Sequence, residues 1–404
     1  MKRILLSLLV AGTLQAQAQN ILDNKVTIKY TQNSNLKIHD GSKTFALDVQ
    51  MNYTQRNADS LKAYETAKAA YLSQLEIAVD AFEQQKAKID QQHLQNLVTW
   101  EQQVASGNTA AQQPVKQPYP AFLPPARPKK PFLIQEITPA SIIAATRVEG
   151  LNQSATSTTK VTLVFEGFEK GMVKQEAKGT GTTTRYEWVI QYRHPVTLKI
   201  EIPGKGLIVN QRIPSTESFR SFRTKEFKSI NEFNLWWSQN EELTWEDRQK
   251  QVVFENMESI NSFMTSNYGY PVMVRRVELY SAKSKDFDYG DVQKAFSTME
   301  SGMLLLAYPE KFNECRNKLS DAVMQYLNIL KESDPTNKKA RIDNVVTSAI
   351  YINLAECYLW MNDFINAEVY ANKAITIGIN KYERDGKALL GLIREQSMRY
   401  SANQ

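Results

Sequence analysis

The sequence predicts an α+β fold. An antiparallel, sandwich-like β-domain carries a long helical and proline-rich insertion and is followed by an all-helical C-terminal domain. Three observations predict it. Period-2 alternation of apolar and polar residues indicates strands on both sides of the insertion, eight of the fourteen prolines fall between Pro114 and Pro139, and the chain after Asp288 has helical spacing throughout.

The first residues are typical of a secretory signal peptide. Lys2 and Arg3 precede a largely apolar run, and Ala16-Gln17-Ala18 fits a cleavage site. We therefore expect residues 1–18 to be removed. The mature protein is expected in the periplasm, free or peripherally associated with the outer membrane. No later segment approaches about 18 uninterrupted apolar residues, so no transmembrane segment is expected.

Charge and residue types argue against several function classes. The net charge of +6 becomes +4 without Lys2 and Arg3 (6 − 2 = 4), which is too small to predict nucleic-acid binding. His39, His93 and His194 are far apart, and no metal-binding, phosphate-binding or nucleophile motif is present. The sequence predicts no metal, no cofactor and no enzyme activity.

Two regions of alternating residues, 19–54 and 140–215, predict the β-domain. The first contains Val26, Ile28 and Tyr30 on one face, and the second contains a strong alternating run around Trp188. Alternation gives each strand one buried and one exposed face. Because strands flank the insertion on both sides, we expect one sandwich, and two separate β-units are the alternative.

Residues 55–113 are predicted to form a coiled-coil-like helical insertion. Leu61, Leu75, Phe82 and Ile89 keep a seven-residue register, although the register is interrupted. The pattern fits either one continuous rod or a helical hairpin.

The proline-rich residues 114–139 follow as a linker. Prolines favour the extended polyproline II conformation and cannot pair in a sheet. The segment is therefore either a semi-rigid spacer or a docking strip anchored by Tyr119 and Phe122.

Residues 216–288 form a mixed segment, mostly helical with one short strand. It contains the densest aromatic patch of the chain. Helical spacing places several of these rings on one face, where they either form a core against the C-terminal helices or present a surface to a partner or a sugar. The candidate partner-binding residues are Phe233, Trp236, Trp237 and Trp245.

Part of the C-terminal region, residues 289–404, resembles a tetratricopeptide repeat. An aromatic residue begins the first helix, a leucine precedes a small residue, an aromatic residue lies in the turn, and small residues occupy the second helix. The residues that carry the resemblance are Tyr351, Leu354, Ala355, Tyr358, Phe364, Ala367 and Ala374.

The resemblance implies that these residues pack helices together and that the domain has a concave groove for a peptide or a partner's helix. A weaker copy precedes the clear one. Two repeats are fewer than the three or so that an independent solenoid needs. We therefore expect the Trp-rich helical segment to complete the groove.

Cys315 and Cys357 are the only two cysteines. An exported chain with two cysteines can form one disulfide, but both residues lie in helical patterns, where a small buried thiol is also common. The sequence leaves this bridge open.

Together these features predict a non-enzymatic envelope protein that mediates protein–protein interaction, as a scaffold or accessory subunit of a periplasmic or outer-membrane complex. The expected partners are other envelope proteins. A glycan- or peptidoglycan-binding or -cleaving protein is one alternative, and a structural subunit of a secretion or motility machine is another.

Overall fold

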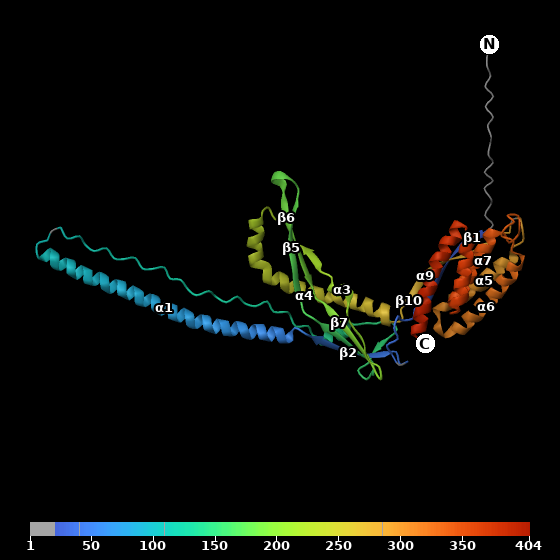
Figure 1. Cartoon of the computed structure of the whole chain (residues 1–404), viewed down its shortest axis with the longest axis horizontal. Coiled ribbons are helices and arrows are strands. Elements are labelled where there is room, and N and C mark those ends of the chain that lie inside the picture. Colours follow the sequence, from blue (N-terminus) through green and yellow to red (C-terminus); the bar gives the residue numbers. More distant parts are fainter. Residues whose placement is uncertain (1–20, 40, 109, 285) are drawn as a thin grey trace, which may run out of the picture.

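The computed structural model describes residues 21–39, 41–108, 110–284 and 286–404, without the side chain of Thr182. The expected signal peptide, residues 1–18, lies outside the described residues. An arm, a central β-region and a C-terminal helical unit follow one another along the long axis (Figure 1). The expected mixed fold, with antiparallel sheets and a C-terminal helical region, is confirmed.

One long β-ribbon forms the central part. β4 (Lys160–Phe165) pairs antiparallel with β7 (Val196–Ile202), and β5 (Glu169–Lys178) pairs antiparallel with β6 (Arg185–Arg193). Since β5 follows β4 and β7 follows β6 after two or three residues, the two pairs continue one another. Further strands are β2 (Thr44–Met51), β3 (Asn152–Gln153) and β8 (Gly206–Arg212) beside β4 and β7, and β9 (Arg220–Arg223) beside β6.

This ribbon differs from the expected antiparallel sandwich. Its two sheets lie end to end along the same two chain segments, as Figure 1 shows for β7 and β6. The larger sheet is also mixed, because β2 pairs parallel with both β3 and β4. Parallel neighbours need a long crossover connection, and the insertion supplies it.

A single long helix, α4 (Ile230–Tyr268), packs against the ribbon. Ser229 caps its N-terminus by accepting from the Glu232 amide at 3.2 Å, while the Glu232 carboxylate accepts from the Lys228 amide at 2.7 Å. Its apolar side chains share one core with both sheets. Of two short helices, α2 (Pro139–Ala145) contacts β2 and α3 (Pro214–Glu217) contacts α4.

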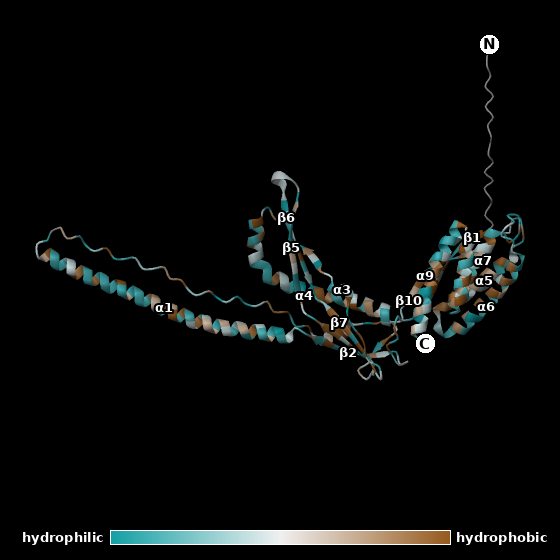
Figure 2. Cartoon of the chain, in the orientation of Figure 1, coloured by the Kyte–Doolittle hydropathy of each residue, from teal (hydrophilic) through white to brown (hydrophobic). Residues whose placement is uncertain are grey.

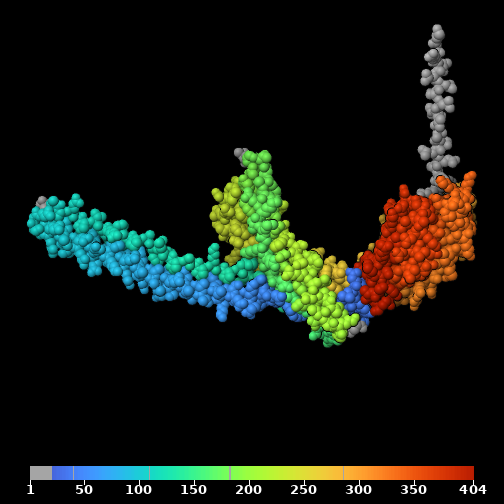
Figure 3. Space-filling view, in the orientation of Figure 1, coloured from blue at the N-terminus to red at the C-terminus, as the bar shows by residue number. Residues whose placement is uncertain are grey.

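The insertion forms the arm, and it contains one rod instead of a helical hairpin. α1 (Thr54–Ala105) runs unbroken for 52 residues, and the proline-rich segment 110–135 returns beside it (Figures 1 and 3). The Trp100 indole donates to the carbonyl of Ala111 at 3.0 Å, and the rings of Phe82 and Phe122 lie 5.3 Å apart. The prolines therefore do not form a spacer between domains; they line the helix that precedes them.

The predicted heptad seam faces this return segment and no second helix. Leu75, Phe82 and Ile89 are half-buried, whereas no residue of α1 is fully buried. Tyr119, one of the expected anchors, donates from its hydroxyl to Asp90 of α1 at 2.7 Å. The docking strip thus docks on the chain's own helix.

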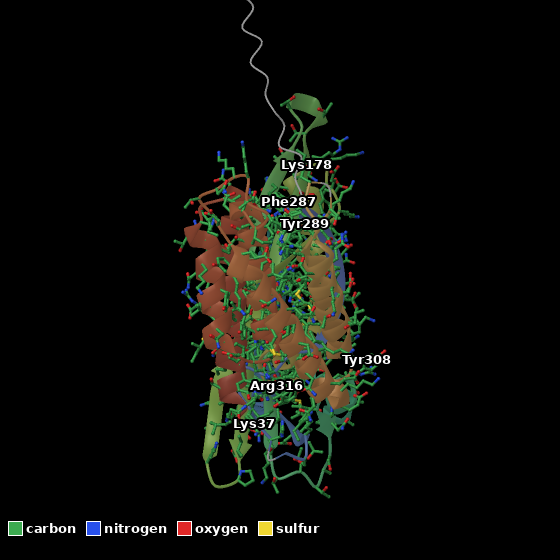
Figure 4. The ribbon with its side chains drawn as sticks, turned by 90° about the vertical axis from the view of Figure 1, so that its right-hand side faces the viewer. Lys37, Lys178, Phe287, Tyr289, Tyr308 and Arg316 are labelled. Atoms are coloured by element: carbon green, nitrogen blue, oxygen red, sulfur yellow. The ribbon has the colours of Figure 1, made fainter. Side chains whose placement is uncertain are left out.

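Five helices form the C-terminal region, with neighbours in sequence packed together. They are α5 (Gly290–Met303), α6 (Phe312–Ile329), α7 (Asn344–Trp360), α8 (Phe364–Thr376) and α9 (Asn380–Ala402). Figure 4 shows Tyr289, just before α5, at one end of the layer and Tyr308 and Arg316, around the start of α6, at the other. The α5–α6 pair is therefore antiparallel.

Two strands from distant parts of the chain complete this helical unit. β1 (Ile21–Thr31) pairs antiparallel with β10 (Val272–Ala282) over eleven residues. Val26 and Ile28 of β1 share the buried core of α5–α9. The predicted domain boundaries are therefore wrong at two places: β1 does not belong to the β-domain, and residues 216–288 are divided between α4, on the ribbon, and β10, in the helical unit.

The two thiols, Cys315 and Cys357, are buried and unbridged. Burial raises the pKa of Cys315 to about 11 and also raises the pKa of Cys357. Both remain protonated at neutral pH and act as small apolar core residues.

Substitution of Asn353 should destabilise the helical unit. The buried Asn353 amide donates to the Tyr280 carbonyl at 2.6 Å and to the Tyr326 hydroxyl at 2.9 Å, and accepts from the Tyr280 amide at 3.0 Å. Asn353→Ala leaves these buried groups without a hydrogen-bond partner. It should lower the free energy of unfolding, measured by urea denaturation, by about 3 kcal/mol. Exposed Asn317→Ala is the control, and equal stability of the two variants would contradict the assignment.

Candidate partner-binding surfaces

The chain's own strands β1 and β10 lie against the face of the C-terminal helices where the repeat resemblance implies a groove. The sheet of β1 and β10 lies against three helices of the unit, α5, α7 and α9. Gln293 of α5 donates to the Ala282 carbonyl at 2.9 Å, Asn353 of α7 binds both backbone groups of Tyr280, and Asp385 of α9 accepts from the Tyr280 hydroxyl at 2.6 Å. A partner cannot use this face while the strands occupy it.

An ion pair fixes β10 further along the same face. Arg275 makes two hydrogen bonds to the carboxylate of Glu356, at 2.8 and 2.7 Å, and Glu356 also accepts from the Trp360 indole at 3.0 Å. A bidentate pair of this kind is geometrically specific. It sets the position of β10 along α7.

The repeat residues named from the sequence all lie in or against this core. Leu354, Ala355, Ala367 and Ala374 are fully buried. The three aromatic residues are half-buried and contact other rings: Tyr358 stacks on Tyr370 at 5.4 Å, Tyr351 lies 5.9 Å from Tyr370, and Phe364 lies 5.6 Å from Tyr400.

The Trp-rich cluster does not meet the helical unit. Phe233 stacks on Trp188 of β6, with ring centroids 3.8 Å apart and planes 5° apart. Trp236 lies 5.4 Å from Phe227, and Trp245 lies 5.8 Å from Trp237. All belong to the ribbon core or pack against it. The expectation that these residues complete the repeat groove is therefore wrong.

Within the cluster, burial separates structural residues from accessible ones. Phe233 is 5% exposed and Trp245 is 3% exposed, whereas Trp236 and Trp237 are half-buried. A sugar platform needs an open ring face, which the first two lack. The cluster is mainly a hydrophobic anchor of α4.

Truncation of Phe233 tests this structural role. Phe233→Ala removes a ring stacked in the ribbon core and should lower the free energy of unfolding by about 3–4 kcal/mol. Leu235→Ala, on the exposed side of the same helix turn, should change stability little. Chemical denaturation followed by tryptophan fluorescence measures both, and a fully stable Phe233→Ala protein would contradict the core assignment.

The arm is attached where the ribbon is interrupted. Gly167, between β4 and β5, has a φ of +116°, and a Cβ there would lie 2.5 Å from the Arg56 guanidinium and 2.9 Å from Ile134. Tyr53 is fully buried and donates to the Gln135 carbonyl at 3.0 Å. Both ends of the arm therefore pack into one gap in the ribbon, which only glycine leaves open.

His194 fills the opposite side of this gap. Its side chain is 2% exposed, and neither ring nitrogen has a hydrogen-bond partner among the described residues. The rings of Tyr53 and Phe165 lie 5.8 and 5.5 Å from it. A cavity of about 200 Å³ adjoins it, also lined by Glu136 and Lys250. Burial lowers the pKa of His194 to about 4.

This pKa predicts acid sensitivity of the arm root. The unfolded histidine binds a proton near pH 6.5 while the folded one does not, so stability is complete above pH 6.5 and falls as the pH drops towards 4. The loss should reach about 3 kcal/mol. Urea unfolding at pH 7 and pH 4 should show a smaller drop for His194→Leu than for the native chain, and equal drops would contradict this.

A groove of about 630 Å³ opens beside the arm root, between the return segment and α4. On its floor the Lys170 ammonium lies 3.9 Å from the ring centre of Phe132 and 4.7 Å from that of Trp245. Burial lowers the pKa of Lys170. Glu241, 3.8 Å from this ammonium, and Glu242 contribute carboxylates from α4. Sequence reasoning missed this groove, because nothing in the local pattern links residue 170 to residues 132 and 245.

Along the arm, apolar side chains remain open to solvent on the surface not covered by the return segment. Figure 2 shows that hydrophobic and hydrophilic residues alternate irregularly along the ribbon of α1. The exposed apolar side chains of α1 include those of Leu61, Leu72, Ile77, Val79, Leu94 and Val98. No other part of the described chain covers them, and the arm stands clear of the body in Figure 3.

The described residues contain no group of three or more histidine, cysteine, aspartate or glutamate side chains arranged to hold a metal ion. Among the helices described, none has the length and apolar character needed to cross a membrane. Comparison of the chain with protein-family models, with curated proteins and with solved structures finds no match.

Proposed function

We propose that the chain is a non-enzymatic envelope protein that mediates protein–protein interaction, as a scaffold or accessory subunit of a periplasmic or outer-membrane complex. The arm carries this proposal. It places a helix of 52 residues with no fully buried side chain and several exposed apolar ones away from the body. A helix of this length, which packs along most of its length only against its own return segment and leaves apolar side chains exposed, is suited to contacting another protein.

In the same proposal, α7 and α8 are a tetratricopeptide-type repeat, and α5 and α6 are a divergent copy. The buried Ala355 and Ala367, in consecutive helices that pack together, support this. Because β1 and β10 occupy the helical groove, we assign the partner contact to the arm. A structural subunit of a secretion or motility machine would differ only in copy number.

Removal of the arm tests the proposal. Asn57 and Ile134 are joined by two hydrogen bonds, of 2.7 and 3.1 Å, so residues 60–131 can be replaced by a short glycine–serine linker. Affinity purification with crosslinking from the native envelope should recover the same partners reproducibly with the full chain and lose them with the armless chain. Tryptophan fluorescence confirms that the armless body is folded. A partnerless full chain, or an unchanged partner set, would refute the proposal.

A glycan- or peptidoglycan-directed function is the second candidate, favoured by the groove at the arm root. Phe132 is half-exposed there, beside the carboxylates of Glu241, Glu242 and Glu246. Binding to insoluble cell wall that is lost in Phe132→Ala would support this function. Equal retention of the native and Phe132→Ala proteins would exclude the groove.

A further inference from the structure

One exposed stripe of α1 is complementary to itself. At 100° per residue, eight residues fall within about 60° of the helix circumference. They are Leu61, Glu65, Lys68, Leu72, Val79, Glu83, Lys86 and Asp90. The centre of the stripe lies about a quarter turn from the face under the return segment, where Tyr71, Phe82 and Ile89 are half-buried. Lys86 and Asp90, at one end of the stripe, also contact Tyr119 of that segment. Its apolar members are open: Leu61 is 46% exposed, Leu72 is 54% exposed and Val79 is 41% exposed.

The order of residue types along the stripe reverses about its centre, between Leu75 and Glu76. Leu72 and Val79 are equidistant from this point. Farther out, Lys68 on one side matches Glu83 on the other, and Glu65 matches Lys86. Two antiparallel copies centred here would therefore place leucine on valine at the middle, with two opposite-charge pairs on each side.

The alternative alignment is unfavourable. Two parallel copies in register would place Lys68 against Lys68 and Glu83 against Glu83, which repel. In the antiparallel alignment, Leu61 falls opposite Asp90, whose carboxylate is already held by Lys116 at 2.6 Å. The charges select the antiparallel arrangement.

The matching charges are also available. Lys68 lies 3.7 Å from Glu65 and Lys86 lies 3.0 Å from Glu83, within the same helix, and the four side chains keep 30–59% of their area exposed. Each lysine can therefore bridge its own glutamate and that of a second copy. This forms a network of charges, which is stronger than isolated surface pairs.

From this complementarity we propose that the arm binds the arm of a second copy of this chain, antiparallel and about a two-fold axis near residues 75 and 76. The contact extends from residue 61 to residue 90, about 43 Å of helix. A two-fold contact of this kind is isologous, so each substitution acts twice. The proposal deepens the proposed function by naming the arm's partner, and it places the two bodies at opposite ends of the assembly.

Sedimentation equilibrium of the full chain tests it. The native protein should show a reversible monomer–dimer equilibrium that weakens with added salt. Lys68→Glu turns two attractive pairs into repulsive ones and should raise the dissociation constant about tenfold. Lys68→Glu combined with Glu83→Lys restores opposite charges across the two-fold axis and should restore dimerisation. Lys88→Glu, on the far side of the helix, should have no effect. Circular dichroism checks that each arm remains helical.

A native chain that stays monomeric at its highest soluble concentration would overturn the dimer. So would failure of the double variant to recover, or equal weakening by Lys88→Glu. These results are distinguishable from failure of the proposed function. If the native chain is monomeric but loses its envelope partners when the arm is removed, the scaffold function stands and the dimer is rejected. If the chain dimerises but has no other envelope partner, the dimer stands and the scaffold function is rejected.

Discussion

The architecture depends on the pairing of β1 with β10. These strands are separated by about 240 residues of chain, yet they pair over eleven positions and share the buried core of the C-terminal helices. Everything between them, the ribbon, the arm and α4, is topologically an insertion into the helical unit. The entropic cost of closing a loop grows only slowly with its length. Burial of the apolar side chains of Val26, Ile28, Val277 and Leu279 offsets this cost. The C-terminal helices are thus completed by a strand from the other end of the chain.

A second constraint is the interruption of the ribbon. If the two strand pairs formed one continuous hairpin, there would be no gap at Gly167 and His194 for the arm to attach to. Instead, Tyr53 and Ile134, from the two ends of the arm, enter the gap together. An unpaired buried imidazole is the cost of this joint, since His194 loses its hydration without gaining a hydrogen bond from a described residue.

Several features were accessible from the sequence because they depend on local patterns. The alternation around Val26 and Trp188 marked strands, and Leu354 to Ala374 marked a packed helix pair, since burial on one face leaves a periodic trace. Pairing leaves no such trace: alternation sets the two faces of β1 but not its neighbour. Likewise, the seven-residue spacing of Leu75, Phe82 and Ile89 is the same whether a second helix or a polyproline segment covers these side chains. The Trp-rich cluster was recognised, but its packing partner Trp188 could be identified only once the ribbon was known.

The attachment of the arm at one end has a mechanical consequence. A helix of 52 residues is about 78 Å long, and the contacts of the arm with the body, including the ion pair between Lys130 and Glu242 of α4, lie near its root. It therefore acts as a cantilever. A rotation of about 5° at the root would carry the tip about 7 Å, more than one helical turn. Small rearrangements around one glycine would be magnified into large changes of reach at the far end.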